Sequence, residues 1–595
     1  MIWNAFFGSL GTEESREAFD NSETFFENSS LKENNSKLTE EQIYVYLPPA
    51  YDCTVLKPYL EIEEWDEKNH VAIGRVKADS FEEFTVLKEG VRVRKVLPPL
   101  VREIESLSEE AFPSGVFFNS LNVSGAGVKV GIISDGVSLL PEVQASKSLP
   151  PDVRVLEAGA GEEGTAMLEI VHEIAPEAEL YFHKAGKNHL EFNKAIDALV
   201  SVGCKIICDD IGWPDEPFFE DGLVATHVQE TIENNDILYI SAAGNDANRH
   251  YQGLFFDDGS GWHDFSAGMS TFKNLYVNIS LGGAVTIILQ WNDSWNSSEN
   301  DYDLFLKDPA GNILACSENV QEGNASPLEY LIYKNPELDS TSTPTSTSTF
   351  TPAPISSSVW GIVCIKKDSG DPKILELFLY PDSSSEVNPT NIVAEDSIYG
   401  HPAIPEVLSV GAIDSKNPGL EIKPFSSKGP VSIYFPEYEL RNKPDLSGPD
   451  NLVVTGKAGK NLILSGTSAS APYVAGIAAL VWSAWPEKTA FEIREMLYTT
   501  TRDLGEPGYD ITYGHGALDV RKCFQNRTEE AEKLDFIDSK REEAEIKASK
   551  NKKGLDLREA FLLFEAWVKE RKAELNIFKK EAGKNPNEDL SELSA

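Results

Sequence analysis

The sequence of 595 residues has little cysteine and no long apolar run. Its six cysteines form no CxxC pair, so a zinc ribbon is not expected. Cys204 and Cys208 lie in an apolar run and are expected in a core as small hydrophobic residues. Cys316 and Cys364 could pair inside one β domain. No stretch of uncharged apolar residues reaches the length of a membrane span, so membrane insertion is not expected.

Positive charge is also scarce, because Lys and Arg total 53 against 96 Asp and Glu, a net charge of −43. Proteins that bind nucleic acids in general need basic patches, so this activity is excluded. The first residues lack a positively charged segment followed by an apolar one, and no secretory signal is evident.

The chain is long enough for several domains, and its patterns change along it. Residues 1–41 are polar and acidic and are predicted to be disordered. Residues 42–96 predict a small α+β unit, with helical spacing near 79–90. Apolar strands alternate with helices over 120–254 and 391–525, which predicts an α/β domain with a doubly wound parallel sheet.

Between the two halves of the α/β pattern, residues 255–390 show strands and turns without helical spacing. They predict an inserted β-sandwich with a Ser/Thr/Pro-rich loop at 339–358. Residues 527–595 predict a charged helical tail. Its amphipathic helix has mixed charge on the polar face, which favours packing on its own protein over membrane binding.

Three motifs carry candidate chemistry. SGTSASAP places Ser468 near the start of a small-residue helix, where free N–H groups favour a developing anion. VGIISDGV is a strand that ends at Asp135, and SAAGND contains Asn245. Taken alone, the Ser468 motif is equally consistent with a capped, buried helix.

Together these segments, in this order, resemble the subtilisin and sedolisin clan of serine peptidases over about 120–525, less the insertion. The resemblance implies a subtilisin-like fold with Ser468 as nucleophile, Asn245 at the oxyanion and Asp135 as the acid. Subtilisins have His-Gly-Thr where this chain has Glu163-Gly164-Thr165. Sedolisins have a catalytic Glu there, and Glu163 matches it. Sedolisins also have an Asp one turn later, where this chain has Met167, and an Asp in place of Asn245.

The predicted site therefore combines Ser468 and Glu163 with Asp135 and Asn245. Two carboxylates in one cleft disfavour double ionisation, so Glu163 and Asp135 are expected to share a proton. A mildly acidic optimum follows. His250 is the one histidine kept as an alternative base.

Further residues are placed around the predicted cleft. Asp210 is expected either as a third acidic group there or, as the favoured interpretation, as an anchor of its loop. Gly212 would let a peptide substrate pair with the strand backbone. Gly466 and Thr467 are expected to shape the nucleophile turn beside the substrate.

The unit at 42–96 resembles the propeptide of subtilisin-like zymogens, which implies that it binds its own catalytic cleft. No cofactor is expected. Asp301 and Asp303 have oxygen-ligand spacing for calcium, although a plain turn is the favoured interpretation. The resemblance favours an extracellular or cell-surface location, and protein or peptide substrates. The alternatives are an inactive scaffold that binds peptides and, more distantly, a carbohydrate-binding protein.

Overall fold

The computed structural model describes residues 41–77, 91–101, 123–257, 259–270, 272–336, 358–417, 419–456, 461–520 and 522–524. The chain divides into two compact units, 1–523 and 524–595, and every element below belongs to the first. The predicted disordered start, the helix predicted near 79–90, nearly all of the Ser/Thr/Pro-rich loop and the charged tail lie outside the described residues.

One nine-stranded sheet organises the α/β part, in the order β27-β28-β24-β21-β11-β9-β6-β8-β7. Neighbouring strands run parallel except for β27 against β28. The strands are β6 (Lys129–Ser134), β7 (Arg154–Glu157), β8 (Glu179–Lys184), β9 (Ile206–Asp209), β11 (Leu238–Ala242), β21 (Leu408–Ile413), β24 (Leu446–Pro449), β27 (Thr501–Arg502) and β28 (Ala517–Leu518).

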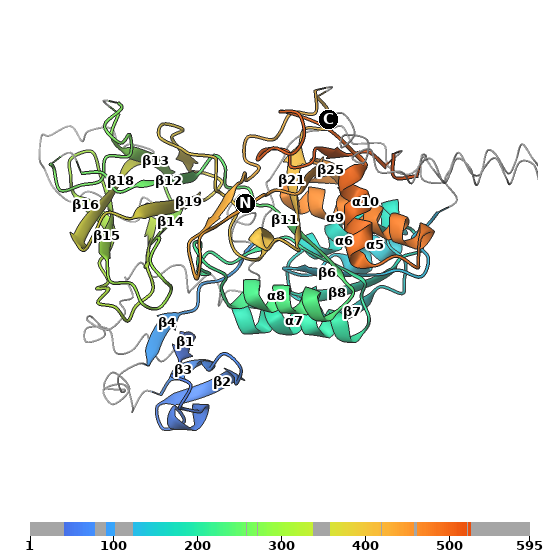
Figure 1. Ribbon diagram of the computed structural model, residues 1–595, viewed down its shortest axis with the longest axis horizontal. Helices are drawn as coiled ribbons and strands as arrows, with labels where there is room; N and C mark the ends of the chain where they lie inside the picture. Colours follow the sequence, from blue (N-terminus) through green and yellow to red (C-terminus); the bar gives the residue numbers. More distant parts are fainter. Residues whose placement is uncertain are drawn as a thin grey trace, which may run out of the picture. The chain divides into compact units, whose positions relative to one another are not determined.

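Helices cover both faces of this sheet, as its uninterrupted apolar strands require. Helices α7 and α8 lie on one face, and α6 and α9 lie on the other (Figure 1). Helix α6 ends two residues before Pro176, as expected for a helix that a proline follows. The helices are α5 (Leu140–Ser146), α6 (Glu163–Ile174), α7 (His189–Ser201), α8 (Leu223–Asn234), α9 (Thr467–Ala484) and α10 (Ala490–Thr499).

Residues 43–76 and 92–95 form a separate antiparallel sheet in the order β2-β3-β1-β4. Its apolar face packs into a small core with Val45, Leu56 and Leu60. A two-residue strand that follows, β5 (Leu100–Val101), leaves this sheet and pairs with β10 (Ile211–Gly212). The other elements are β1 (Ile43–Tyr46), η1 (Cys53–Val55), β2 (Leu60–Asp66), β3 (Val71–Val76) and β4 (Arg92–Lys95).

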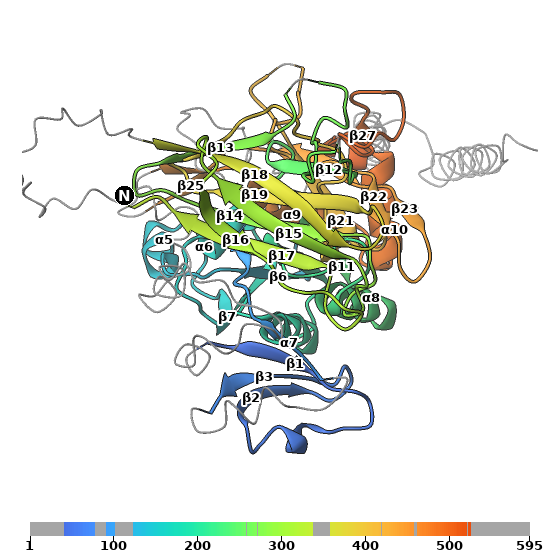
Figure 2. The ribbon, with the colours of Figure 1, turned by 90° about the vertical axis from the view of Figure 1, so that its left-hand side faces the viewer.

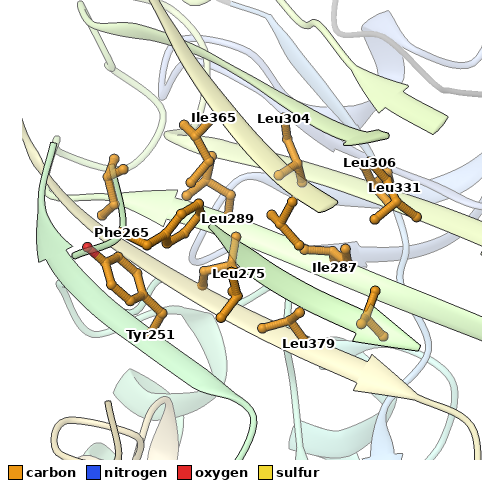
Figure 3. Packing of buried hydrophobic residues seen from close by; sticks show 14 of the residues in the cluster. Tyr251, Phe265, Leu275, Ile287, Leu289, Leu304, Leu306, Leu331, Ile365 and Leu379 are labelled. Atoms are coloured by element: carbon orange, nitrogen blue, oxygen red, sulfur yellow. The ribbon is translucent and has the colours of Figure 1, made fainter. Parts of the chain in front are cut away.

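Between β11 and β21 the chain forms two antiparallel sheets, β12-β19-β14-β17 and β16-β15-β18-β13-β20 (Figure 2). One apolar core, with Leu289 and Leu304 among its members, lies between them (Figure 3). The strands are β12 (His250–Leu254), β13 (Leu275–Ser280), β14 (Ala284–Trp291), β15 (Asp301–Lys307), β16 (Ile313–Ser317), β17 (Leu328–Lys334), β18 (Ser358–Ser369), β19 (Ile374–Pro381) and β20 (Glu386–Val387). The first strand thus begins five residues before the predicted boundary at 255.

The cysteines that could have paired in this region do not. Cys316 on β16 and Cys364 on β18 both lie opposite Phe305, on either side of strand β15. Two strand spacings separate their backbones by about 10 Å, beyond the roughly 7 Å that a disulfide can bridge. All six cysteines are free thiols.

Short elements complete the α/β part. They are the 3-10 helix η4 (His401–Ala403) and the hairpins β22 (Val431–Ile433) with β23 (Glu439–Arg441) and β25 (Leu452–Thr455) with β26 (Asn461–Leu464). No helix within the described residues is both long and apolar enough to span a membrane.

Candidate active site

Three candidate polar residues follow three neighbouring strands of the large sheet. Asp135 comes directly after β6, Asp210 after β9 and Asn245 shortly after β11, and these strands are adjacent in the order β6-β9-β11. The carboxyl ends of parallel strands lie at one edge of the sheet, where α/β folds place their ligand crevices. The fold therefore brings the three side chains to a common edge.

The start of helix α6 lies against Asp135. The backbone N–H of Glu163 donates to Asp135 Oδ1 over 3.1 Å, which joins the helix start to the end of β6. The contact requires a glycine at 161, because a Cβ there would lie 1.8 Å from the Asp135 carboxylate. Glu163 itself is buried. The two predicted acids are thus neighbours.

Helix α9 presents Ser468 in its first turn. Gly466 caps the helix with φ 99°, a conformation that favours glycine. Its N–H donates to Asp450 Oδ1 over 2.7 Å, and this hydrogen bond fixes the turn before the helix. The Ser468 side chain is buried, and its Oγ makes no hydrogen bond to another described residue.

Asn245 is tied to this turn by Thr467. The Thr467 N–H and Oγ1 donate to Asn245 Oδ1 over 3.0 and 3.1 Å. The Gly244 N–H in turn donates to Thr467 Oγ1 over 3.2 Å. An amide held through its oxygen presents its NH₂ group as the donor, the end that an oxyanion would need.

The two consecutive acids at the end of β9 make different contacts. Asp209 Oδ1 accepts from the Ile211 N–H over 3.0 Å and lies 3.0 Å from His401 Nε2. Asp209 is therefore the loop anchor that the sequence favoured assigning to Asp210. The Asp210 carboxyl lies within hydrogen-bonding reach of the Glu163 carboxyl and the Ser134 hydroxyl.

The Asp210 side chain has no exposed surface. Burial, with a contribution from the charge of Asp209, raises the pKa of Asp210 to about 7, although the contacts with Glu163 and Ser134 work in the other direction. A carboxyl with this pKa holds a proton through mildly acidic conditions.

His250, the alternative base, is engaged elsewhere. Its Nδ1 lies 2.7 Å from the Val393 carbonyl oxygen, and its Nε2 lies 3.6 Å from Glu376 on β19. Burial lowers its pKa. These contacts hold the ring in the β-sandwich region.

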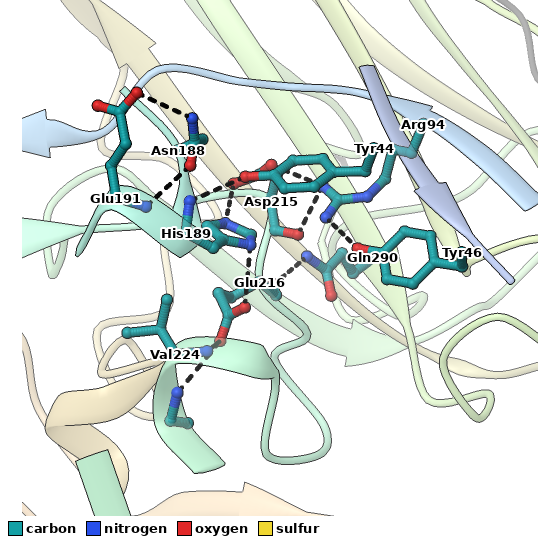
Figure 4. A network of polar contacts seen from close by, with 11 residues as sticks. Tyr44, Tyr46, Arg94, Asn188, His189, Glu191, Asp215, Glu216, Val224 and Gln290 are labelled. Carbon is teal, nitrogen blue, oxygen red and sulfur yellow. Dashed lines mark hydrogen bonds and ion pairs between the residues drawn. The ribbon is translucent and has the colours of Figure 1, made fainter. Parts of the chain in front are cut away.

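The 41–101 segment is held to the α/β part by a buried polar network (Figure 4). Arg94 Nη1 donates to Asp215 Oδ2 over 2.6 Å, and His189 Nε2 lies 2.9 Å from Asp215 Oδ1. Tyr44 Oη accepts from the His189 N–H over 3.0 Å. Burial opposes ionisation of Asp215, but the charges of His189 and Arg94 outweigh it and lower the pKa to about 2.

Strand β5 lies beside the site. Leu100 is opposite Gly212 and Val101 is opposite Ile211, in antiparallel register. Gly212 thus pairs with a segment of this same chain, at the strand predicted to pair with a peptide substrate. Asp210 is the residue just before that pairing.

The candidate calcium residues lie at the beginning of strand β15. Asp301 and Asp303 alternate with Tyr302, and Lys366 Nζ is 3.6 Å from Asp303 Oδ2. Burial, aided by the charge of Asp368, raises the pKa of Asp303 to about 7. In the described parts of the chain, no group of three or more His, Cys, Asp or Glu side chains could hold a metal ion.

The sequence pattern missed several supporting residues. Gly161 leaves room for the Asp135 carboxylate. Asp450 Oδ1 accepts from the Gly466 N–H, and Asp450 Oδ2 lies 3.2 Å from Lys423 Nζ. A glycine or acid next to a candidate residue's own turn was the sequence signal available for both.

Comparison with known proteins supports the subtilase resemblance for part of the chain. Residues 368–516, which include Ser468, match the family model described as Subtilase family. Mycosin-2 of Mycobacterium tuberculosis is 35% identical over 116 residues, 19% of this chain and 20% of that protein. Subtilisin DY of Bacillus licheniformis is 32% identical over 128 residues, 21% of this chain and 40% of that protein.

The chain therefore spans between a fifth and two fifths of the length of these two relatives. Among solved structures, the CspB protease of Clostridium perfringens is 16% identical, with a TM-score of 0.46, over 68% of this chain and 94% of that chain. The matched family segment contains Ser468 and the turn before it but neither Asp135 nor Glu163. The sedolisin-like interpretation of Glu163 stays a prediction.

Proposed function

We propose that the protein is a serine endopeptidase in which Ser468 is the nucleophile and Glu163 the general base. The observation that carries the proposal is the common sheet edge. There the Asp135 carboxylate accepts a hydrogen bond from the Glu163 N–H. Asn245 Oδ1 accepts one from the N–H of Thr467, the residue before Ser468. The subtilase match over the Ser468 segment supports it.

In the proposed reaction, Ser468 Oγ attacks the carbonyl carbon of a peptide bond while Glu163 takes the hydroxyl proton. The tetrahedral intermediate collapses when Glu163 returns that proton to the leaving amine. Water, deprotonated by Glu163, then hydrolyses the acyl-enzyme and regenerates Ser468. Asp135 orients Glu163 through the start of α6.

The oxyanion is stabilised by Asn245 Nδ2 and by the N–H groups at the start of α9. Asn245→Ala is expected to lower kcat by about 10²–10³ with little change in KM. Because an amide donor needs no protonation, acid is required only for the carboxyl groups, and a mildly acidic optimum follows.

The proposal includes self-inhibition by residues 41–101. In this proposal Leu100 and Val101 are the residues on the amino side of the scissile bond, and their pairing with β10 supports it. Self-cleavage is therefore expected within the few residues that follow Val101. The buried contact of Arg94 with Asp215 would keep the cut unit bound afterwards.

The test is incubation of the purified protein from about pH 3 to about pH 8, followed by intact mass. Cleavage just after residue 101 in the parent, and none in Ser468→Ala or Glu163→Gln, is expected. Cleavage that survives Glu163→Gln but not Ser468→Ala would contradict the assignment of the base. Glu169→Gln, a buried acid on the same helix that bonds Thr455, is the matched control.

One observation favours a second candidate, an inactive scaffold that binds peptides along β10. Ser468 Oγ makes no hydrogen bond to another described residue, so the nucleophile and base are not yet engaged. The scaffold predicts no cleavage at any pH, with the full-length chain intact, and tight binding of a β5-like peptide once residues 41–101 are displaced.

Calcium at Asp301 and Asp303 remains a separate proposal. Both side chains are buried and lie two residues apart on one strand. Calcium binding should raise the midpoint of thermal unfolding of the parent and leave Asp301→Asn/Asp303→Asn unaffected. An equal response of both proteins would contradict it.

A further inference from the structure

Asp210 is the buried acid for which the proposed reaction has no task. It has no exposed surface, and neither of its carboxylate oxygens accepts a well-formed hydrogen bond from another described residue. Its side-chain neighbours are instead the Glu163 carboxyl and the Ser134 hydroxyl. Two carboxyls in contact repel when both are ionised, so this contact requires a shared proton.

The backbone around Asp210 shows why its side chain is committed to this contact. Asp209 anchors the turn through the Ile211 N–H and His401. Ile211 and Gly212 are then fixed as strand β10. Asp210, between these two restraints, is held at the end of β9 beside Ser134 at the end of β6.

Helix α6 has no acidic residue one turn after Glu163, where sedolisins have an Asp. Met167, one turn after Glu163, is buried and apolar. A carboxyl partner for Glu163 must therefore come from an element other than α6.

We propose that Asp210 is a positioning residue that carries a proton, donates it in a hydrogen bond to the Glu163 carboxylate and so holds the base toward Ser468. This inference deepens the proposed function and rests on it for its kinetic part. Asp210 keeps its proton in the hydrogen bond to Glu163 throughout, and Glu163 takes the Ser468 proton and later returns it.

Three acidic side chains lie around Asp210, and the His401 imidazole contacts the adjacent Asp209. Glu163 comes from α6, Asp209 from its own strand, and Asp135 follows β6 next to Glu163. Burial raises the pKa of Asp210 to about 7. Above that pH the Asp210 proton is lost, the pair carries two charges, and activity is expected to fall.

The kinetic test compares the pH profile of kcat/KM for the parent and Asp210→Asn on an unfolded protein substrate. An amide donates to Glu163 at every pH. The parent is therefore expected to lose about tenfold per pH unit above its upper limit, while Asp210→Asn keeps its activity there. Asp210→Ser, which keeps a small polar group, covers the case in which the amide variant does not fold.

Glu169→Gln is the control, because this acid on α6 bonds Thr455 at β25. Its pH profile should match that of the parent. An Asp210→Asn profile with the same upper limit as the parent would overturn the proposal, as would a fall in kcat/KM by one factor at all pH values.

An infrared titration of the protonated carboxyl band, in the Ser468→Ala background, reads the pair without activity. The component of the band that is lost in Asp210→Asn should titrate near neutral pH and shift in Glu163→Gln, whereas the component from Asp303, another buried acid with a raised pKa, should be unchanged. If the frequency and the titration midpoint of the Asp210 component do not change in Glu163→Gln, the pairing of Asp210 with Glu163 is wrong. If the parent neither hydrolyses protein nor reacts with a fluorophosphonate at Ser468, the proposed function fails while this titration still decides the pairing.

Discussion

Two buried acids five residues apart in the chain behave in opposite ways. Asp210 and Asp215 both have no exposed side-chain surface. The pKa of Asp210 is raised to about 7, and that of Asp215 is lowered to about 2. Burial raises both values, so the difference comes from the neighbours. Asp210 faces other acids, whereas Asp215 faces Arg94 and His189.

The comparison separates two uses of a buried carboxyl. At the sheet edge, a buried carboxyl that faces other acids keeps a proton up to near-neutral pH. At the contact with residues 41–101, a carboxyl held by the Arg94 guanidinium and the His189 ring keeps its charge and joins two sheets. The strand β10 between them lets one short segment serve both the site and the contact.

The largest expected effect is the loss of the Asp215 charge. Asp215→Asn leaves Arg94 buried without its ion partner, and breaking such a pair costs about 3–5 kcal/mol. Urea denaturation at neutral pH should show this loss of the free energy of unfolding. After self-cleavage, the fragment that contains β1 to β4 should also dissociate faster, as measured by size-exclusion chromatography.

The matched double variant is Arg94→Met/Asp215→Leu, which removes both charges. It should recover most of the lost stability, because a buried ion pair replaced by apolar side chains is often nearly neutral. Equal instability of the single and double variants would mean that shape, and not charge, holds this contact.

The second largest effect is a gain in the free energy of unfolding, expected when Asp210 is replaced. Because its pKa is higher in the folded than in the unfolded chain, the protein loses stability as pH rises from about 4 to about 7. Asp210→Asn removes that ionisation and should be about 2–4 kcal/mol more stable than the parent above neutral pH. The two proteins should be equally stable near pH 4, and a constant difference across pH would contradict the assignment.

The third effect lies at acid pH and belongs again to Asp215. Its pKa is lower in the folded than in the unfolded chain, so its contribution is complete above about pH 4 and lost as pH falls toward 2. The contribution is about 2–3 kcal/mol. The difference in the free energy of unfolding between the parent and Asp215→Asn should therefore shrink by about 1 kcal/mol between pH 5 and pH 3.

The sequence predicted what depends on neighbouring residues. The alternation of apolar strands and helices predicted the α/β sheet, and the Gly-Thr-Ser turn predicted the start of α9 at Thr467. Asp135 could be expected near Glu163 because both lie in segments that resemble the same family of peptidases. These features follow from the residue pattern of single segments and from the order of those segments along the chain.

The sequence could not predict contacts that the packing of distant elements decides. Asp209 and Asp210 are adjacent and chemically identical, and only the direction of each side chain from the end of β9 makes one an anchor and the other a partner of Glu163. The pairing of Arg94 with Asp215 joins residues 121 positions apart. Cys316 and Cys364 looked compatible until strand order placed β15 between them.

The smallest effect comes from an ion pair that links the same two regions as Arg94 and Asp215 but lies at the surface. Lys194 on α7 is 3.0 Å from Glu64 on β2, and 64% of the lysine side chain is exposed. Solvent screens such pairs, so Glu64→Gln should change the free energy of unfolding by less than about 1 kcal/mol. The change should vanish in high salt, whereas that of Asp215→Asn should persist. If both variants respond equally to salt, burial does not distinguish the two contacts, and the contrast between the buried acids loses its physical basis.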